Sequence, residues 1–481
     1  MTSLPEPTAL PRTVLVTGAG GAGRSTVAAA TALAAARGGR RTLLLTTDAL
    51  GTQAALAVRL PVTPEGQLPG APEGEPAAST ETERSTDEAT GGAEVGHPAW
   101  PAPVEAAPGL WAARLETAEG HREEFLALQR QGSAALRLLG TTPLDREELT
   151  ALPGGRALAL LRALRALHDG AAAASPQRGG PLAWDLVVID MPPLPETLEL
   201  LALPEQLRRY LRRLLPARRQ TGGSLRPLLA QLAGVPMPDG WLHAAAARWE
   251  EELSLAQAVV EARTTTLRLV VEPGPAAVEA LHDAGGGIAL YGHRVDCLTA
   301  NRMLPASSPD PWAESLADQQ RRGLDGLRRS GRAAGHPVHP VPHLGRDPRG
   351  LADLVELLAA AGQPEPAEEQ GPFTPSPRPG GRADDPWTVE DLLDSDGFLL
   401  WHLPLPDVER GEIQLVRRGG EVSLSVGRFR RILPLPLPLR SCTVAGARMA
   451  DGRLSVRFAP DRARRPGHPL PGGMLPPEGS A

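Results

Sequence analysis

The stretch that decides the fold is residues 13–26, TVLVTGAGGAGRST. A short apolar, β-rich run over 13–17 leads into a glycine-rich loop over 18–23, and a helix is expected over 24–37. The spacing is that of the phosphate-binding loop G-x-x-x-x-G-K-[ST], except that Arg24 takes the lysine position. Backbone N–H groups of such a loop point at phosphate oxygens, and the helix N-terminus adds partial positive charge. The stretch therefore predicts strand, phosphate loop and helix.

This chain is rich in glycine and alanine, so the same loop sequence would also fit a turn that binds no ligand. The residues that end the neighbouring strands are needed to choose between the two interpretations. Asp48 closes the run 42–48, and Asp190 closes the apolar run 184–190. Beside a phosphate loop, the carboxyl ends of parallel strands are where magnesium or an attacking water would lie. Each aspartate alone is more often a turn or cap. Together, they favour a nucleotide site.

Strands and helices alternate along most of the chain, which predicts a doubly wound α/β fold with a mostly parallel sheet. Further strands are expected at 109–116, 265–272, 294–300 and 337–344. Expected helices occupy 119–139, 156–168, 196–215, 242–262, 275–284, 312–334 and 348–361. We assign this domain to residues 1–362, with part of about 119–262 forming a helical subdomain.

Two polar stretches interrupt the pattern. Residues 61–108 carry eight acidic residues against one arginine between Glu65 and Glu94, which predicts a disordered acidic insertion. Residues 363–385 are proline-rich and predict a linker. Beyond the linker, apolar residues recur at every second position, which is typical of β-strands, and Asp451-Gly452 predicts a hairpin turn. We therefore expect a small all-β sandwich over 386–460. Residues 461–481 are expected to form a flexible tail.

Composition narrows the class of protein. The net charge of −6 over 481 residues disfavours a nucleic-acid binder. Two distant cysteines, Cys297 and Cys442, fit a reducing cytoplasm and make no cysteine-rich metal site. The amino terminus lacks an apolar signal region, and nowhere do 18 apolar residues run together. We expect a cytoplasmic protein without stable membrane insertion.

The residues around both aspartates resemble one family. Segment 190–204, DMPPLPETLELLALP, looks like the second switch of the ArsA arsenite-pump ATPases and the tail-anchored-protein targeting ATPases, and 47–51, TDALG, resembles their first switch. Segment 290–305, with Asn301-Arg302, is similar to the family's strand ending in Asn-Arg, and 341–351 to its purine loop. The β-rich segment from about 386 resembles the small-heat-shock-protein-like domain appended to some bacterial members.

The resemblance implies a homodimeric P-loop ATPase that binds ATP and Mg²⁺ at the dimer interface. Asp48 matches the catalytic residue that activates water, and Ser25 with Asp190 matches the magnesium-holding pair. The asparagine of the family contacts adenine, which assigns that role to Asn301, the chain's single asparagine. The implied nucleotide-binding residues are Gly18, Gly20, Gly21, Ala22, Gly23, Arg24, Ser25, Thr26, Asn301, Arg302 and Pro342.

The sequence departs from the family at two costly positions. The family's loop reads Gly-Lys-Gly-Gly-Val-Gly-Lys-Thr, whereas this chain has Ala19 and Arg24 at the lysine positions and no lysine anywhere. Arginine keeps the charge but has a wider, planar head group. A cation placed at a transferring phosphoryl group can carry about 10³–10⁵ in rate. We therefore expect nucleotide-driven switching of a client or partner surface with weak or slow hydrolysis.

Alternatives remain open at this stage. A catalytically dead pseudo-ATPase, acting as a scaffold or chaperone-like interaction protein, is the second hypothesis. The resemblance to the targeting ATPases implies a possible groove for a hydrophobic protein client, built from 119–139, 205–233 and 242–262. For the amphipathic pattern of 205–215, packing on the protein's own core is the simpler explanation. Arsenite transport is disfavoured because the family's arsenite-binding cysteines are missing, and a DNA-partitioning role is disfavoured by the charge.

Overall fold

The computed structural model describes residues 10–61, 103–115, 126, 144, 145, 148, 154–173, 184–214, 239–362, 371–375, 387–406 and 408–460. The chain divides into two compact units. The first comprises 1–273, 295–331 and 336–379, and the second comprises 274–294, 332–335 and 380–481. The predicted helix 119–139 and tail 461–481, and most of the insertion 61–108, lie outside the described residues.

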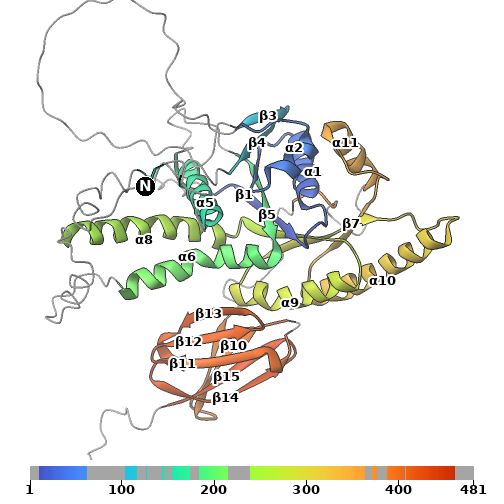
Figure 1. The fold of residues 1–481 in the computed structure, drawn as a ribbon. Helices are drawn as coiled ribbons and strands as arrows, with labels where there is room; N and C mark the ends of the chain where they lie inside the picture. Colours follow the sequence, from blue (N-terminus) through green and yellow to red (C-terminus); the bar gives the residue numbers. More distant parts are fainter. Residues whose placement is uncertain are drawn as a thin grey trace, which may run out of the picture. The chain divides into compact units, whose positions relative to one another are not determined.

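The first unit is built on an eight-stranded sheet in the order β3-β4-β2-β5-β1-β6-β7-β8 (Figure 1). All neighbouring strands are parallel except β3 and β4, which are antiparallel at one edge. The sheet confirms the predicted fold class. Its strands are β1 (Arg12–Gly18), β2 (Thr42–Thr46), β3 (Val104–Ala107), β4 (Leu110–Arg114), β5 (Leu186–Pro193), β6 (Thr265–Val271), β7 (Val295–Met303) and β8 (Val338–Pro342).

Helices connect these strands. They are α1 (Arg24–Arg37), α2 (Ala49–Leu56), α5 (Gly155–Ala173), α6 (Leu194–Leu214), α8 (Asp239–Glu261), α10 (Pro311–Ala334) and α11 (Gly350–Ala360). The 3.6-residue periodicity located all of these except α2 to within a few residues. Sequence reasoning also missed β3, which lies in the predicted insertion and gains its structure from pairing with β4.

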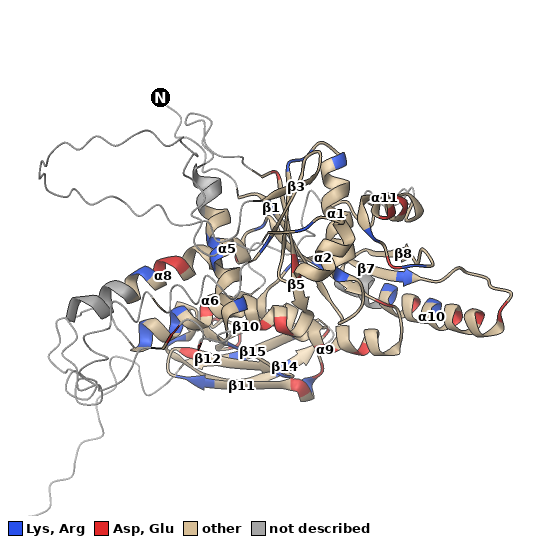
Figure 2. Ribbon diagram, turned by 45° about the horizontal axis from the view of Figure 1, so that its top comes forward, with Lys and Arg blue, Asp and Glu red and all other residues tan. Residues whose placement is uncertain are grey.

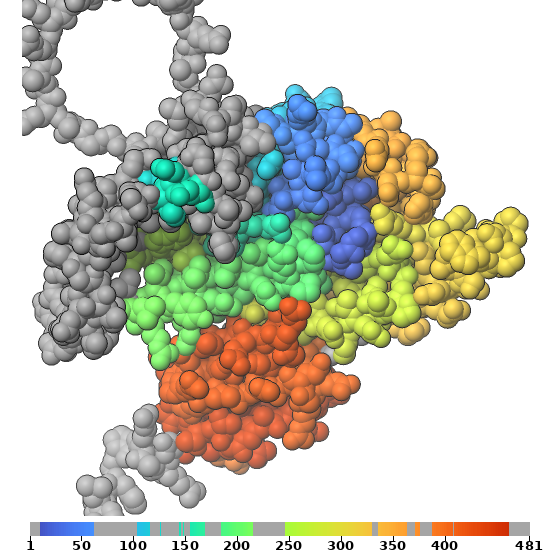
Figure 3. Space-filling view, viewed as in Figure 1, coloured from blue at the N-terminus to red at the C-terminus, as the bar shows by residue number. Residues whose placement is uncertain are grey.

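Both faces of the sheet are buried, as the continuous apolar strands require. Val14 and Val16 point into a core shared with α1, α2 and α11, while Leu15 between them is also buried and therefore faces the other side. The surfaces of α1 and α2 (blue) and of α11 (orange) lie side by side in Figure 3. Alanine dominates the buried side of α1, which lets the helix lie close to the strands.

Helix α8 packs against both α5 and α6. Arg208 of α6 donates from Nε to Glu250 (3.0 Å) and from Nη1 to Gln257 (2.7 Å) of α8. The arginine-rich face of α6 is thus partly occupied by its neighbour, while Tyr210 and Leu214 are 49% and 72% exposed. Charge is mixed along the longer helices, for example on α10, where acidic and basic residues alternate (Figure 2).

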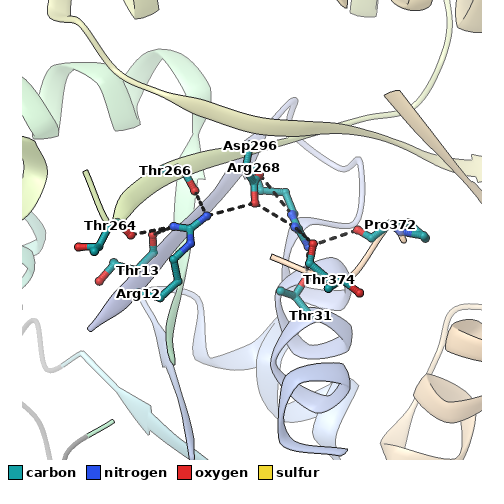
Figure 4. Close-up of polar contacts among 9 residues, drawn as sticks. All are labelled: Arg12, Thr13, Thr31, Thr264, Thr266, Arg268, Asp296, Pro372 and Thr374. Atoms are coloured by element: carbon teal, nitrogen blue, oxygen red, sulfur yellow. Dashed lines mark hydrogen bonds and ion pairs between the residues drawn. The ribbon is translucent and has the colours of Figure 1, made fainter. Parts of the chain in front are cut away.

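Two deeply buried charges of the first unit form an ion pair. Arg268 of β6 and Asp296 of β7 each have 1% of their side chain exposed, with Nη2 and Oδ2 2.9 Å apart. Arg268 also donates to Thr31 Oγ1 of α1 (2.9 Å) and to the carbonyls of Pro372 and Thr374 (3.2 Å each). Arg12 approaches Asp296 at 3.7 Å from the other side (Figure 4). Every donor direction of the buried guanidinium is used, which offsets part of its desolvation cost.

A short segment of the predicted linker belongs to this core. Residues 371–375 lie within 363–385, yet Phe373 is only 4% exposed and packs in the cluster that contains α1 and α11. Because Arg268 holds the carbonyls on both sides of Phe373, the segment is anchored by one aromatic side chain and two hydrogen bonds. The first unit therefore extends at least to Pro375.

The second unit contains an all-β sandwich, as predicted for 386–460. One sheet has the order β14-β15-β10-β9 and the other β11-β12-β13. Trp401 and Phe458 fill its core. Asp451 and Gly452 have positive φ values of 49° and 65° and form the β14–β15 turn, as their sequence predicts. The strands are β9 (Thr388–Leu392), β10 (Phe398–Pro404), β11 (Ile413–Arg418), β12 (Glu421–Val426), β13 (Phe429–Pro434), β14 (Cys442–Ala450) and β15 (Arg453–Pro460).

The second unit also includes one helix from the middle of the chain, α9 (Pro275–Tyr291). The sequence predicts that this helix ends at residue 284, because glycines follow at 285–287. The prediction is wrong at that end, since α9 continues through the three glycines to Tyr291 and is capped by Gly292, which has a left-handed φ of 74°. Packing against the sandwich, described below, explains the extension.

Asp296→Asn should destabilise the first unit by about 3–5 kcal/mol, because it leaves the buried Arg268 charge without its counter-ion. Urea unfolding measures the change. Glu196→Gln is the matched control: it breaks the exposed Arg156–Glu196 pair, whose side chains are 50% and 45% exposed, and should cost less than about 1 kcal/mol. Equal losses in the two variants would contradict the role assigned to the buried pair.

Candidate nucleotide-binding site

The glycine loop connects β1 to α1 and is fixed from behind. A Cβ atom on Gly18, whose φ is 153°, would lie 1.8 Å from the carbonyl oxygen of Val270 in β6. The N–H of Ala19 donates to that same oxygen at 3.1 Å. No atom of the described residues lies within 4 Å of a Cβ added to Gly20 or Gly21. The loop is therefore supported by β6 on one side and open on the other, as a phosphate loop must be.

Asn301, at the end of β7, is the second support of the loop. Its side chain is buried, and Nδ2 donates to the carbonyl oxygen of Ala22 at 2.8 Å. A Cβ on Gly23 would lie 2.4 Å from the same nitrogen, so this position also needs glycine, whose φ here is 86°. The structure thus gives the single asparagine a contact with the loop itself. Its contact with adenine stays a prediction.

Arg24 begins α1 and folds back over the loop. Its Nη1 lies 3.4 Å from the carbonyl oxygen of Gly18 and 3.5 Å from that of Ala19, which are long for N–H···O bonds. Its Nε is buried without a hydrogen-bond partner among the described residues. The guanidinium is therefore held weakly by its own loop. A phosphate oxygen could offer it a shorter, charge-assisted bond.

Ser25 and Asp190 form the centre of the site. Asp190 lies on β5 with 1% exposure, and its Oδ2 accepts hydrogen bonds from Ser25 Oγ (2.7 Å), Thr46 Oγ1 (3.1 Å) and Thr52 Oγ1 (3.2 Å). Burial raises the pKa of Asp190 to about 6, while the three hydroxyl groups and the charge of Arg24 act in the opposite direction. The carboxylate is buried but provided with donors that favour its ionised form.

Asp48 stands at the N-terminus of α2, beside this centre. Its N–H donates to Thr46 Oγ1 at 3.0 Å, and its Oδ1 accepts from the N–H of Gly51 at 3.4 Å. A Cβ on Gly51 would lie 2.7 Å from Ser25 Oγ and 3.5 Å from Asp48 Oδ2, which shows how closely α2 approaches the loop. The structure thus brings Ser25, Asp48 and Asp190 together, as the sequence predicts.

Two hydroxyl groups of this centre were missed by sequence reasoning. Thr46 ends β2 directly opposite Asp190 in the parallel register, and Thr52 lies on α2, a helix that the sequence did not predict. The position of Thr46 at the end of its strand could have indicated that it lies near Asp190, because adjacent parallel strands end at the same edge of the sheet. Thr52 could not be found in this way.

The predicted purine-side residues lie near the end of β7. Arg302 has a left-handed φ of 59°, and its Nη1 donates to the carbonyl of Gly21 at 2.9 Å while Nη2 contacts Asp347 at 3.0 Å. Pro342 ends β8 and pairs with Met303. Arg302 is thus a third residue that fastens the loop from behind. For Thr26 we find only its place in the first turn of α1.

The donor set fits magnesium held together with phosphate. Mg²⁺ in phosphate-transfer sites takes one or two protein oxygens and completes its shell with water and phosphate. Ser25 and the buried Asp190 supply such oxygens next to the open loop. In the part of the chain that the structure describes, no group of three or more metal-ligating side chains forms an all-protein cage. Ser25 and Asp190 are therefore the side chains that would hold a magnesium ion at this place.

The doubly wound sheet and the glycine loop between β1 and α1 define a fold of the P-loop ATPase-like class. The chain matches the model of the anion-transporting ATPase family, ArsA, over residues 11–51 and 100–358, and the model of the HSP20-like domain found in ArsA over 396–458. These matches cover more than half of the chain. The protein belongs to the ArsA ATPase family and carries its HSP20-like domain.

Relatives with the same organisation occur in several bacteria. An uncharacterized protein of Streptomyces coelicolor is 45% identical over 452 residues, covering 94% of this chain and 98% of that one. A protein of Mycobacterium tuberculosis is 29% identical over 94% and 96% of the two chains. A Chlorobaculum tepidum protein with the provisional name arsenical pump-driving ATPase is 22% identical over 93% and 96%. No helix within the described ranges combines the length and apolarity needed to cross a bilayer.

Thr52→Val should lower the unfolding free energy by about 1.5–3 kcal/mol at pH 8, because it removes a hydrogen bond to a buried charge. The loss should shrink at pH 5, since the pKa of Asp190 is about 6 in the folded protein and the neutral carboxyl depends less on donors. Urea unfolding at the two pH values measures both effects. Thr52→Ser, which keeps the hydroxyl, is the control, and a pH-independent loss would refute the assignment.

Proposed function

We propose that this protein binds Mg-ATP at the glycine loop, hydrolyses it slowly, and uses the nucleotide state to switch a client or partner surface. The observation that carries the proposal is the convergence of Ser25, Asp48 and the buried Asp190 beside a glycine loop whose outer side is open. Family membership adds support, because the matched model describes ATPases. A merely structural turn would not need a buried carboxylate with three hydroxyl donors.

Each residue of the site has a distinct role in this proposal. The N–H groups of residues 18–24 and the N-terminus of α1 would bind the phosphates, and Arg24 would leave its own carbonyls to contact phosphate oxygens. Ser25 and Asp190 would hold magnesium, directly or through water, and the metal would neutralise phosphate charge. Asp48 would orient the attacking water and accept its proton, a role typical of a carboxylate at this position.

A homodimer is proposed for two reasons. The open side of the loop, around Gly20 and Gly21, leaves the phosphates uncovered unless another surface closes over them. Leu50, two residues after Asp48, is 81% exposed and presents a large apolar side chain next to the site. A second copy of the chain would cover both. We place the dimer in the cytoplasm, without a nucleic-acid partner.

A second candidate function is a pseudo-ATPase scaffold or chaperone-like interaction protein. It is favoured by Ala19, which removes the family's partner-reaching lysine, and by the guanidinium of Arg24 lying on the loop's own carbonyls. ATP would then bind, if at all, without turnover. The two functions differ in phosphate release and share the nucleotide-binding step.

Arsenical transport is not part of the proposal. That activity appears in the provisional names of relatives such as the Chlorobaculum tepidum protein. In this chain Cys297 and Cys442 are buried and free, and burial raises the pKa of Cys297 to about 12. Thiolates are the species that bind soft metalloid ions, so a thiol held neutral is poorly suited to that role.

Asp48→Asn should lower the rate of phosphate release at least about 100-fold, because the carboxamide cannot accept a proton from water. Binding of ATP with magnesium, measured by calorimetry, should change less than about threefold, since Asp48 does not contact the phosphates in the ground state. Tight ATP binding by the parent protein without any phosphate release would favour the scaffold instead. No heat of binding at millimolar ATP would overturn both.

Ala19→Lys should raise the hydrolysis rate at least about tenfold, a conservative fraction of what a cation contributes at a transferring phosphoryl group. Arg24→Lys should tighten ATP binding, because a compact ammonium fits inside the loop better than a planar guanidinium. Arg37→Lys is the matched control: it makes the same substitution at the exposed end of α1 and should leave both quantities unchanged. Identical responses at positions 24 and 37 would contradict a role for Arg24 in the site.

A further inference from the structure

Helix α9 contains a feature that helical propensity opposes. Residues 285–287 are three consecutive glycines in its interior, and each glycine costs about 1 kcal/mol relative to alanine in a helix. Nevertheless the helix continues for another turn, to Tyr291. Since Gly286 and Gly287 are both buried, their missing side chains indicate close packing with another element.

The element is the face of the sandwich formed by β12 and β13. A Cβ on Gly286 would lie 2.6 Å from Val426 Cγ1 and 3.3 Å from Val408 Cγ2. A Cβ on Gly287 would lie 2.7 Å from Cδ2 of Phe429. Side chains of the sandwich therefore lie directly on the helix backbone. Gly285, by contrast, has nothing within 4 Å of an added Cβ.

Polar contacts hold the last turn of α9 to β13. The hydroxyl of Tyr291 donates to the carbonyl of Arg430 at 3.2 Å, and its ring meets Phe429 edge-on at 6.2 Å. Arg431 donates from Nη1 to the carbonyl of Leu290 at 3.0 Å, where a cation also favours the helix dipole. Its guanidinium lies 4.8 Å from the ring centre of Trp387. The attachment thus combines close apolar packing with two directional bonds.

Helix α9 lies between the two strands that support the glycine loop. The family model for the ATPase, residues 100–358, includes α9, which connects β6 to β7. β6 provides the Val270 carbonyl that accepts from Ala19, and β7 provides Asn301, which holds Ala22. Both strands that support the glycine loop therefore continue directly into the ends of the helix that the sandwich holds.

We propose that α9 is the coupling helix of this protein: the HSP20-like sandwich binds it through Gly286 and Gly287, and the nucleotide loop and the sandwich influence each other through β6 and β7. The attachment follows from packing alone. The coupling to nucleotide rests on the proposed function. A partner bound to the sandwich would then alter nucleotide affinity, and nucleotide would alter the affinity for that partner by the same factor.

The test compares alanine substitutions in the full-length chain. Alanine favours the helix at all three glycines, so only packing can make their effects differ. In the double variant Gly286→Ala/Gly287→Ala, hydrogen exchange of the amides 286–292 should become at least about tenfold faster, because the helix loses its support. In Gly285→Ala it should stay the same or become slower. Slower exchange in the double variant would overturn the attachment.

A milder variant guards against a folding failure. Tyr291→Phe keeps the ring packing and removes only the hydroxyl bond to Arg430. It should speed exchange at the end of α9 while leaving the exchange of β10 and β15 in the sandwich core unchanged. Unchanged exchange at the end of α9 in this variant would count against the attachment, whatever the double variant does.

Calorimetric titration with Mg-ATP separates the coupling from the attachment. The double variant should change the dissociation constant at least about fivefold, the lower range for coupled sites, and Gly285→Ala less than twofold. Faster exchange with unchanged ATP affinity would overturn the coupling and leave the attachment. If the parent chain binds no ATP, the proposed function and the coupling fail together, whereas the exchange experiment still decides the attachment.

Discussion

The parallel register of β1, β5 and β2 is the constraint on which the site depends. Asp190 pairs with Val16 on one side and Thr46 on the other, so the ends of three strands bring the glycine loop, the buried carboxylate and the first switch to one edge of the sheet. The strands are apolar on both faces and covered by helices. A slip of one residue would move Asp190 to the opposite face and remove it from Ser25.

The backbone conformation of the glycine loop does not depend on the lysines that other family members carry in it. Gly18 and Gly23 are fixed by the backbone of β6 and by Asn301, neither of which involves a cation. The shape of the loop therefore does not need the two lysines that the family has and this chain lacks. In the proposed function a lysine at either position would act on phosphate, so its loss would change nucleotide affinity and hydrolysis rate more than folding.

Glycine serves two different purposes in this protein. In the loop, positive φ and the close approach of Val270 require it. In α9, the backbone is helical, and glycine is required only because Val426 and Phe429 occupy the space of a side chain. A prediction from helical propensity alone therefore ends α9 before its three glycines, because propensity takes no account of this packing. The two groups of glycines are connected through the chain, because α9 lies between β6 and β7, the strands that support the loop.

The sequence by itself determined the α/β class and the hairpin at Asp451-Gly452, because periodicity and turn chemistry are local. It also predicted a site with Ser25, Asp48 and Asp190, and the structure brings these three residues close together. The hydroxyls of Thr46 and Thr52 on Asp190, the Arg268–Asp296 pair and the anchoring of Phe373 were decided only by tertiary structure. Their partners are far apart in the chain, as with Thr52 and Asp190, whose positions differ by 138. No local pattern encodes such contacts, which arise only when the sheet aligns its strands.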